Sequence, residues 1–413
     1  MNQISKAFAN ILFFIYATIP LESIAAKTKS IATKKIIIEQ QVTDSDIIRH
    51  FNTTPILLKS RQAIVIDFDT GIILLEKKPF EKMLPSSMTK MMTSYIIQEK
   101  IKKAEISYDS QFPVSEKAWR IGGSKTFVSL GDKVRVEDLL RGIIIQSGND
   151  ACIVAAEGLY GSEELFVNEM NAKAQELGMK NTNFMNSSGW PEENHYSTAY
   201  DLALLGIALI KDHPDFYSLY SEKTFTFGKD QKGRPITQGN RNTLLYKEIG
   251  CDGIKTGHTE DGGFGIAASF IDNGKRYIMV INGLSSMKER SSEAEILLNW
   301  VKHNFINKKL FAKGDIVEKE AKVLFGMKEA IPLILKEDVM ILIPRLNQNN
   351  VNIKLEYASP IKAPIKEGDL VGKMVINIDN KIHETTIIAG ESVEEIGVFS
   401  KIMHSVKLWL FGK

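Results

Sequence analysis

The chain has few cysteines and little net charge, and each of these shortages excludes certain classes of protein. Its 413 residues include 2 Cys, Cys152 and Cys251, too few for a disulfide framework, so we expect two free, buried thiols. No CxxC pair, HExxH string or other dense His/Cys cluster occurs, so a structural zinc site or a zinc peptidase has no support. The net charge of +2 provides no strong field for nucleic acid, and we expect no such partner.

The apolar run at the N-terminus is short. Lys6 precedes Ala7–Pro20, which is shorter than the ~20 residues that span a bilayer, and small residues follow at Ser23–Ala26. This pattern predicts a signal peptide over residues 1–26, cleaved near Ala25 or Ala26; an uncleaved anchor and a buried helix are the alternatives. We therefore expect an exported protein on the periplasmic face of the cytoplasmic (inner) membrane.

The whole chain is 44% hydrophobic, enough for one large and one smaller core, so we expect two domains. Residues 27–58 have no clear period, and we interpret them as a mobile lead-in. Beyond Arg61, two hairpins are predicted, with mainly helical patterns between them. The hairpin strands are Ala63–Phe68 with Ile72–Leu75, and Gly265–Ile271 with Tyr277–Asn282; the helical runs include Val136–Ile145, Ala151–Tyr160 and Glu164–Leu177. The pattern indicates an α+β domain, an antiparallel sheet with a helical lobe, closed by a helix at Glu293–Asn304.

From residue 314 to residue 395 the pattern changes to short β-like runs, which suit a small C-terminal β-sandwich. The last segment, Gly397–Lys413, predicts an amphipathic helix that lies in a membrane interface. A helix docked on the protein body is the alternative. The expected apolar stripe comprises Phe399, Ile402, Met403, Val406, Trp409 and Leu410.

A first chemical motif follows Pro85, at the start of a helical run. In Ser87-Met88-Thr89-Lys90 the serine and the lysine are three residues apart, so they share a helix face. Backbone N–H groups of a first helical turn favour an oxyanion near Ser87 and disfavour a charged Lys90. A lysine kept neutral by burial and nearby positive charge can serve as the base for a serine nucleophile.

Two further motifs stand downstream. In Ser147-Gly148-Asn149 the serine can relay a proton and the asparagine can hold a substrate amide. In Lys255-Thr256-Gly257, ahead of a predicted strand, the lysine can lower the pKa of Lys90 and attract a carboxylate. Gly257 permits close approach of the backbone, and a strand edge can pair with an extended peptide. Each motif alone is a common string, but the three in this order form a known signature of β-lactamases and penicillin-binding proteins.

On these motifs, from about Arg61 to the C-terminus, the chain resembles the low-molecular-mass penicillin-binding proteins that act as D-alanyl-D-alanine carboxypeptidases, serine peptidase family S11. The resemblance implies a transpeptidase-like catalytic domain over residues 59–310 and the β-domain over 314–395. It implies catalytic roles for Ser87 as nucleophile, Lys90 as base and Ser147 as proton relay. It also implies that Asn149, Lys255, Thr256, Gly257 and His258 bind substrate, with an oxyanion hole from the backbone N–H groups of Ser87 and His258.

Two more residues are weighed on the same basis. Arg290 stands where the family places an arginine near the terminal substrate carboxylate; an exposed arginine is the equal alternative. His195 is a conceivable base, but a structural hydrogen-bonding role is favoured because Lys90 already fills that role.

The expected reaction removes the terminal D-alanine from peptidoglycan stem peptides through a Ser87 acyl-enzyme, without metal or organic cofactor. β-Lactams are expected to acylate the same serine. A β-lactamase is the first alternative, although Ser-Gly-Asn stands where class A enzymes carry Ser-Asp-Asn. A catalytically idle envelope protein that binds wall peptides is the second, and the three intact motifs argue against it.

Overall fold

The computed structural model describes residues 34–42, 56–345, 351–378 and 381–411. The chain divides into a larger unit, Thr54–Asn304, and a smaller unit that joins Phe305–Lys413 to an N-terminal strand, β1 (Lys34–Val42). The predicted signal peptide lies outside the described residues. Each unit has its own hydrophobic core.

A five-stranded antiparallel sheet forms the framework of the larger unit, in the order β3-β2-β10-β9-β8. Both predicted hairpins are confirmed, and they meet because β2 pairs with β10, with Val65 opposite Met279. β3 and β8 are the two edge strands of the sheet. The strands are β2 (Gln62–Asp67), β3 (Ile73–Lys77), β8 (Cys251–Thr259), β9 (Gly263–Asp272) and β10 (Lys275–Leu284).

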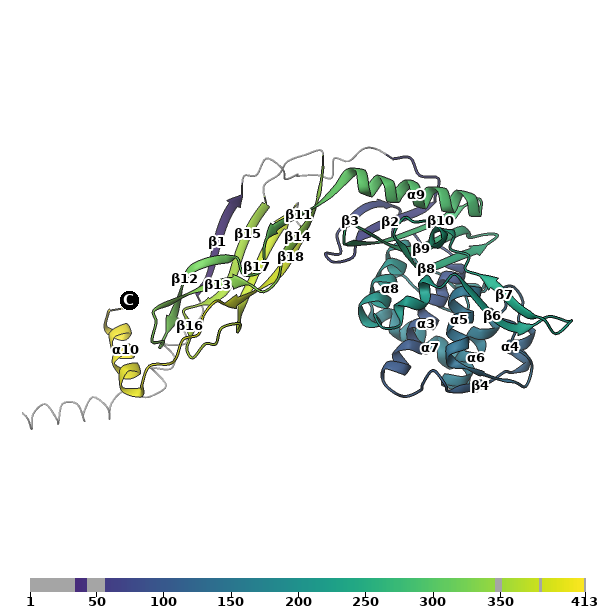
Figure 1. Cartoon of the computed structure of the whole chain (residues 1–413), viewed down its shortest axis with the longest axis horizontal. Helices are drawn as coiled ribbons and strands as arrows, with labels where there is room; N and C mark the ends of the chain where they lie inside the picture. Colours follow the sequence, from purple (N-terminus) through teal and green to yellow (C-terminus); the bar gives the residue numbers. More distant parts are fainter. Residues whose placement is uncertain (1–33, 43–55, 346–350, 379–380, 412–413) are drawn as a thin grey trace, which may run out of the picture. The chain divides into compact units, whose positions relative to one another are not determined.

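Helices cover both faces of this sheet. α8 (Ala199–Asp212) packs on β2 and β10, and α9 (Met287–Asn304) packs on β9 and β10; Figure 1 shows them on opposite sides of the strands. Every residue of β2 is therefore buried, and its middle, Ala63–Ile66, is a continuous apolar run rather than an alternating one. α9 contains the predicted closing helix Glu293–Asn304 and begins earlier.

The helical lobe lies on the α8 face of the sheet and shares its core (Figure 1). Its main helices are η1 (Ser86–Thr89), α3 (Lys90–Lys102), α4 (Glu116–Arg120), α5 (Val136–Arg141), the π-helical η2 (Gly142–Gln146), α6 (Asn149–Tyr160) and α7 (Glu163–Glu176). Short strands β4 (Gln111–Pro113) and β5 (Lys133–Arg135) pair beside them. The predicted helical runs are confirmed, and each sequence motif falls at an element boundary or on β8.

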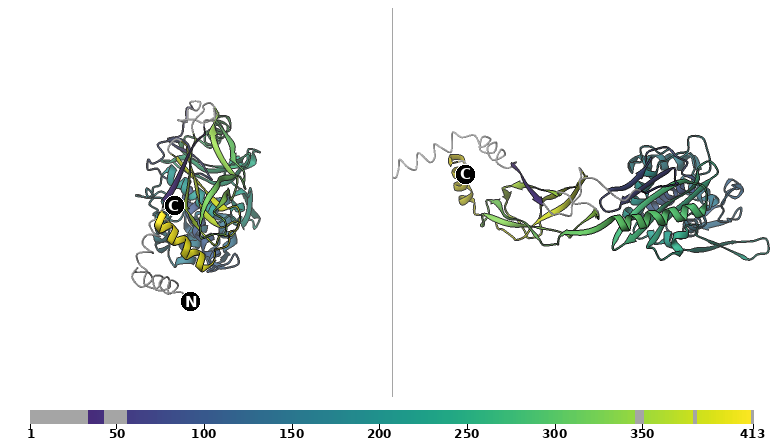
Figure 2. Two further views of the ribbon diagram at one scale, coloured as in Figure 1. Left: turned by 90° about the vertical axis from the view of Figure 1, so that its left-hand side faces the viewer. Right: turned by 90° about the horizontal axis from the view of Figure 1, so that it is seen from above.

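A hairpin of β6 (Thr224–Lys229) and β7 (Pro235–Gly239) projects from the larger unit, as Figure 2 shows. Two short 3₁₀ helices, η3 (Tyr217–Ser221) and η4 (Thr243–Tyr246), flank it in sequence. This hairpin was not predicted from the sequence.

The smaller unit is the expected β-domain. Its seven-stranded sheet has the order β1-β15-β17-β18-β13-β12-β16, and a second sheet pairs β11 with β14. The core contains residues of both sheets, such as Leu333 and Leu355 from the first and Ile341 from the second, as a sandwich requires. The strands are β11 (Phe305–Phe311), β12 (Ile316–Leu324), β13 (Ala330–Leu335), β14 (Val339–Pro344), β15 (Val351–Ser359), β16 (Ile361–Lys362), β17 (Leu370–Ile378) and β18 (Lys381–Ala389).

Two boundaries differ from the sequence interpretation. Within the lead-in 27–58, β1 pairs antiparallel with β15, from Lys34 opposite Ser359 to Val42 opposite Val351, so this stretch is not wholly without structure. The isoleucines Ile36–Ile38 favour an extended strand, and β15 provides its partner. The units divide between Asn304 and Phe305 rather than after Leu310, because β11 pairs with β14.

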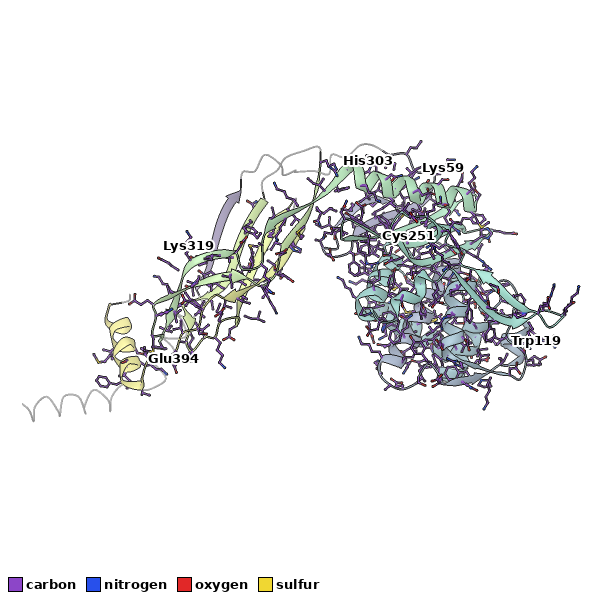
Figure 3. The ribbon with its side chains drawn as sticks, in the orientation of Figure 1. Lys59, Trp119, Cys251, His303, Lys319 and Glu394 are labelled. Carbon is purple, nitrogen blue, oxygen red and sulfur yellow. The ribbon has the colours of Figure 1, made fainter. Side chains whose placement is uncertain are left out.

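The C-terminal segment forms α10 (Val398–Phe411), within the predicted helix Gly397–Lys413. Lys401 pairs with Glu395 at 2.5 Å, and Figure 3 labels the neighbouring Glu394 beside the start of this helix. Of the stripe residues whose side chains are described, Phe399, Ile402, Met403 and Val406 are exposed. None of the described helices is long and apolar enough to cross a bilayer.

Candidate active site

Ser87 and Lys90 come together at the junction of η1 and α3. Lys90 Nζ lies 3.0 Å from Ser87 Oγ, as the three-residue spacing predicts. Ser87 is partly exposed, whereas Lys90 is only 1% exposed. A hydroxyl that solvent can reach therefore contacts an amine that solvent cannot.

The Lys90 amine has two further partners. Nζ donates to Asn149 Oδ1 at 2.7 Å and to the backbone oxygen of Ser188 at 2.6 Å. Burial lowers the pKa of Lys90 to about 8, and the nearby Arg241 charge acts in the same direction. A minor neutral fraction is therefore available near pH 7 to accept a proton, and this fraction grows as the pH rises through about 8.

Ser147 and Lys255 form a second pair. Ser147 has left-handed backbone angles, φ 60° and ψ 33°, in the sharp turn between η2 and α6. Its Oγ accepts a hydrogen bond of 3.0 Å from Lys255 Nζ, which also donates to the Thr256 backbone oxygen. Burial holds the pKa of Lys255 well below its usual value, and the charge of Lys90 adds to this effect. The two lysines are close enough to influence each other.

Strand β8 carries Lys255-Thr256-Gly257 along the free edge of the sheet. Its other side pairs with β9, with Thr256 opposite Ile266 and Gly257 opposite Gly265. A Cβ on Gly257 would lie 2.9 Å from the Pro85 backbone oxygen and 3.2 Å from Ser86 Cβ. The absence of a side chain at Gly257 thus allows β8 to approach η1 closely.

His258 lies on β8 and Arg290 lies on α9, and their side chains differ in exposure. The exposed His258 ring stacks on Phe264, with 3.8 Å between ring centroids. Arg290 is 3% exposed, so the alternative of an exposed arginine is wrong. Its Nη2 donates to the Arg241 backbone oxygen at 2.9 Å, and burial lowers its pKa to about 10. Its charge reaches Lys255 and lowers the pKa of that lysine.

His195 has partners that fit a structural role. Its Nδ1 accepts from the Met185 backbone N–H at 3.1 Å, and its Nε2 lies 2.9 Å from Thr89 Oγ1. Burial lowers its pKa to about 4, so the ring is neutral at pH 7. No hydrogen bond found in the described structure joins it to Ser87 or Lys90.

The two cysteines are free, as expected. Cys152 is buried, and burial raises its pKa to about 12. Cys251, labelled in the sheet in Figure 3, is only partly buried, so the expectation of two fully buried thiols holds for one of them. Within the described ranges, no group of three or more His, Cys, Asp or Glu side chains is arranged to hold a metal ion.

Several residues at this site were not identified from the sequence. Arg241, just ahead of η4, is one; the Ser188 backbone oxygen is another, because a backbone acceptor has no residue-type signal. The third is Asp150, which follows Asn149 directly and accepts hydrogen bonds from the backbone of residues 126–128. Its adjacency to the motif was the one signal available in the sequence.

The arrangement defines a class. A partly exposed serine beside a buried lysine, a second serine–lysine pair and a free strand edge suit acyl transfer from a peptide to a serine hydroxyl. Comparison with known proteins supports this class. Residues 49–286 match the family model described as D-alanyl-D-alanine carboxypeptidase, and residues 305–395 match the C-terminal domain of penicillin-binding protein 5.

The similarity extends over most of the chain. It is 37% identical over 369 residues to D-alanyl-D-alanine carboxypeptidase DacA of Haemophilus influenzae, covering 88% of this chain and 92% of that protein. Identity to DacC of Escherichia coli is also 37%, over 84% of this chain and 88% of that protein. The crystal structure of penicillin binding protein 5 from Haemophilus influenzae aligns with a TM-score of 0.71 at 36% identity, covering 83% of this chain and 100% of that one.

The chain therefore belongs to the D-alanyl-D-alanine carboxypeptidase family, serine peptidase family S11. The resemblance drawn from the three motifs is confirmed, and so is the fold class of a penicillin-binding-protein catalytic domain with a C-terminal β-domain. The expectation of a serine-type peptidase is confirmed as well.

Proposed function

We propose that this protein removes the terminal D-alanine from peptidoglycan stem peptides through an acyl-enzyme on Ser87. The observation that carries the proposal is the 3.0 Å contact between Ser87 Oγ and the buried Lys90 amine. Burial lowers the pKa of that amine to about 8, so a minor fraction is neutral near physiological pH, which is the state that a general base needs.

Acylation begins when Lys90 takes the hydroxyl proton of Ser87. The Oγ attacks the carbonyl carbon of the penultimate D-alanine and forms a C–O bond, and the carbonyl oxygen takes the negative charge. Backbone N–H groups of Ser87 and His258 are the proposed donors to that oxyanion. The C–N bond to the terminal D-alanine then breaks, and the leaving amine receives a proton by way of Ser147, which Lys255 contacts. Water hydrolyses the resulting ester and restores Ser87.

The substrate peptide is proposed to lie along the edge of β8. An extended peptide can add to that edge as a further strand, with backbone hydrogen bonds to β8. Asn149 is proposed to bind an amide of the peptide, and Lys255, Thr256 and Arg290 are proposed to supply donors and positive charge for the terminal carboxylate. Gly257 lets this strand approach the nucleophile.

β-Lactams are proposed to acylate Ser87 in the same way, because their strained amide carbonyl takes the place of the peptide carbonyl. Their acyl-enzyme retains the leaving amine, since the ring opens without releasing a fragment. If the retained amine blocks the approach of water, the ester on Ser87 hydrolyses slowly.

The cellular setting is also a proposal. The predicted signal peptide 1–26 supports export to the periplasm, and the exposed apolar residues of α10 support attachment to the membrane surface. The intact mass of the purified mature protein tests the first point, because cleavage near Ala25 or Ala26 sets the N-terminal residue. The vesicle experiment described in the Discussion tests the second.

Mass spectrometry of the protein lacking α10 tests the catalytic proposal. After exposure to penicillin, we expect a lasting adduct on the peptide that contains Ser87. A peptide ending in D-Ala-D-Ala should release free D-alanine, and Ser87→Ala should abolish both results. Rapid penicillin turnover without peptide cleavage would instead indicate a β-lactamase, and no adduct at all would indicate an idle binding protein.

A further inference from the structure

Asp150 is a buried carboxylate next to the Ser147–Asn149 turn, with no role in the mechanism above. It is 1% exposed, and the described part of the chain places no cationic group within 4.0 Å of it. Charge-assisted hydrogen bonds are about twice as strong as neutral ones, so its four backbone partners hold it firmly. The donors are the N–H groups of Thr126 (2.8 Å) and Ala151 (2.9 Å) to Oδ1, and of Phe127 (2.8 Å) and Val128 (3.2 Å) to Oδ2.

Three of these donors belong to residues 122–128, here called the cover segment, which rests on the turn. The backbone N–H of Asn149 donates to the Ser124 backbone oxygen at 2.8 Å. A Cβ on Gly148 would lie only 2.0 Å from Thr126 Oγ1, so the segment and the turn are in direct contact. Asp150 therefore joins two stretches of backbone that are more than twenty residues apart in sequence.

The cover segment also sets the orientation of the Asn149 side chain. Asn149 Nδ2 donates to the Gly122 backbone oxygen at 2.9 Å, which leaves Oδ1 to accept from Lys90 Nζ at 2.7 Å. A shift of the segment would turn this amide and remove a partner of the general base. Asp150 can thus act on Lys90 without touching it.

We propose that Asp150 is a positioning residue for acyl transfer: its carboxylate fixes the cover segment against the turn, and its negative charge offsets the buried positive charge around Lys90. The inference deepens the proposed function and rests on it. The charged groups around Lys90 are mainly positive, and the Asp150 carboxylate offsets part of that positive charge. Lys255 on β8 and Arg241 ahead of η4 are basic; the other titratable groups that influence or respond to Lys90 are Cys152 on α6 and His195.

The first experiment measures the pH dependence of kcat/KM for Asp150→Asn. The negative charge of Asp150 raises the pKa of Lys90, so its removal should move the ascending limb of the profile to lower pH, by less than about 1 unit because the two groups do not touch. The disturbed Asn149 amide should lower the maximum of kcat/KM by about 10- to 100-fold. A purely structural role would lower the maximum without moving the limb.

A second measurement follows backbone amide exchange in the cover segment. An asparagine at position 150 keeps one acceptor oxygen, and its NH₂ group cannot accept the hydrogen bonds now made to Oδ2. The amides of Phe127 and Val128 should therefore exchange faster, and more so than the amides of α3. Unchanged exchange at both positions would remove the proposed fixing of the segment.

The matched control is Asp201→Asn. Asp201 is also 1% exposed and accepts hydrogen bonds from the Asn181 backbone and from Thr182, but its charge does not act on Lys90. This variant should lower the thermal midpoint while it leaves the pH limb in place. A limb that shifts equally in both variants would overturn the proposal.

If Asp150→Asn does not fold, Asp150→Glu tests the proposal instead, because glutamate keeps the negative charge and displaces the carboxylate. It should leave the limb at the wild-type pH while kcat/KM falls; a limb that moves to lower pH with the charge retained would contradict the proposal. The penicillin adduct on Ser87 of the unmodified protein tests the proposed function separately, so the two failures can be told apart.

Discussion

At the scale of single residues, the site depends on burying a lysine without pairing it to a carboxylate. Lys90 has a hydroxyl, an amide oxygen and a backbone oxygen as partners, and none of these carries a full charge. Burial therefore outweighs the opposing effects of Cys152 and Asp150 on its pKa, which is why the value falls to about 8 rather than staying near 10.5.

This pKa predicts the pH dependence of the reaction. Below pH 8 most Lys90 is protonated and cannot accept the Ser87 proton; above it the amine is neutral. The kcat/KM for a D-Ala-D-Ala peptide should therefore rise with pH through about 8, since this ratio reports groups of the free enzyme. Lys90→Ala should lower kcat/KM by about 100- to 10 000-fold and flatten that limb.

His195→Gln is the control for this titration. Its ring lies near Lys90 but has a pKa of about 4 and structural partners, so its replacement should leave the limb near pH 8. If the limb persisted in Lys90→Ala and vanished in His195→Gln, the assignment of the base would pass to the histidine.

At the scale of elements, the site depends on how closely β8 approaches η1. Gly257→Ala would place a methyl group 2.9 Å from the Pro85 backbone oxygen, where neither backbone can give way cheaply. We expect β8 to move away from Ser87 and penicillin acylation to slow by about 100-fold. Stopped-flow acylation kinetics, with circular dichroism to verify folding, measure this effect.

Gly239→Ala is the matched control, because Gly239 is also a glycine in a strand. Its added methyl group would meet only the Tyr246 hydroxyl at 3.2 Å and the Lys223 backbone oxygen at 3.9 Å, on a hairpin edge. Acylation should stay at the wild-type rate in this variant. An equal loss in both variants, or no loss in Gly257→Ala, would show that the close approach of β8 does not limit the reaction.

The sequence predicts those parts of the site that depend on short spacings. Ser87 and Lys90 are three residues apart on one helix face, so their contact follows from helical geometry. The contact of Ser147 with Lys255 spans 108 residues, and the sequence motifs placed both residues at the site without predicting that they touch. Asp150 binds backbone N–H groups more than twenty residues away. Backbone donors carry no residue-type signal, so its role could not be predicted from the sequence.

The same distinction applies to the fold. Hairpins such as β2–β3 and β9–β10 follow from apolar runs around turns, and they were predicted correctly. The hairpin β6–β7 was missed although Thr224–Phe227 alternates polar and apolar residues, because β7 contains one aliphatic residue, Ile236, and neither strand has a fully buried residue. β11 was assigned to the preceding domain because its partner, β14, lies about thirty residues further along the chain.

At the scale of the whole molecule, the catalytic site and the helix proposed to bind the membrane belong to separate units with separate cores. The active-site residues named above all lie in the larger unit, whereas α10 ends the smaller one. Changes to α10 should therefore affect membrane binding and leave the chemistry at Ser87 unchanged, which allows the two functions to be tested apart.

The apolar stripe of α10 predicts binding to a lipid surface. Phe399 is 78% exposed and Met403 is 56% exposed, so their replacement disturbs little packing within the protein. Each such side chain contributes about 1.5–3 kcal/mol when buried in an apolar phase. In co-sedimentation with vesicles of anionic phospholipid, Phe399→Glu with Met403→Glu should bind at least about 10-fold more weakly, and deletion of residues 397–413 should abolish binding.

Ser400→Glu separates the loss of apolar contact from the added negative charge. It places one carboxylate on the same helix beside the stripe, so it should weaken binding only modestly and mainly at low salt. Penicillin acylation of Ser87 should be equal in all these variants, because α10 lies outside the unit that contains Ser87. If the truncated protein sedimented with vesicles as the full-length protein does, the helix would be a packing element of the β-domain, and attachment would have to arise elsewhere in the chain.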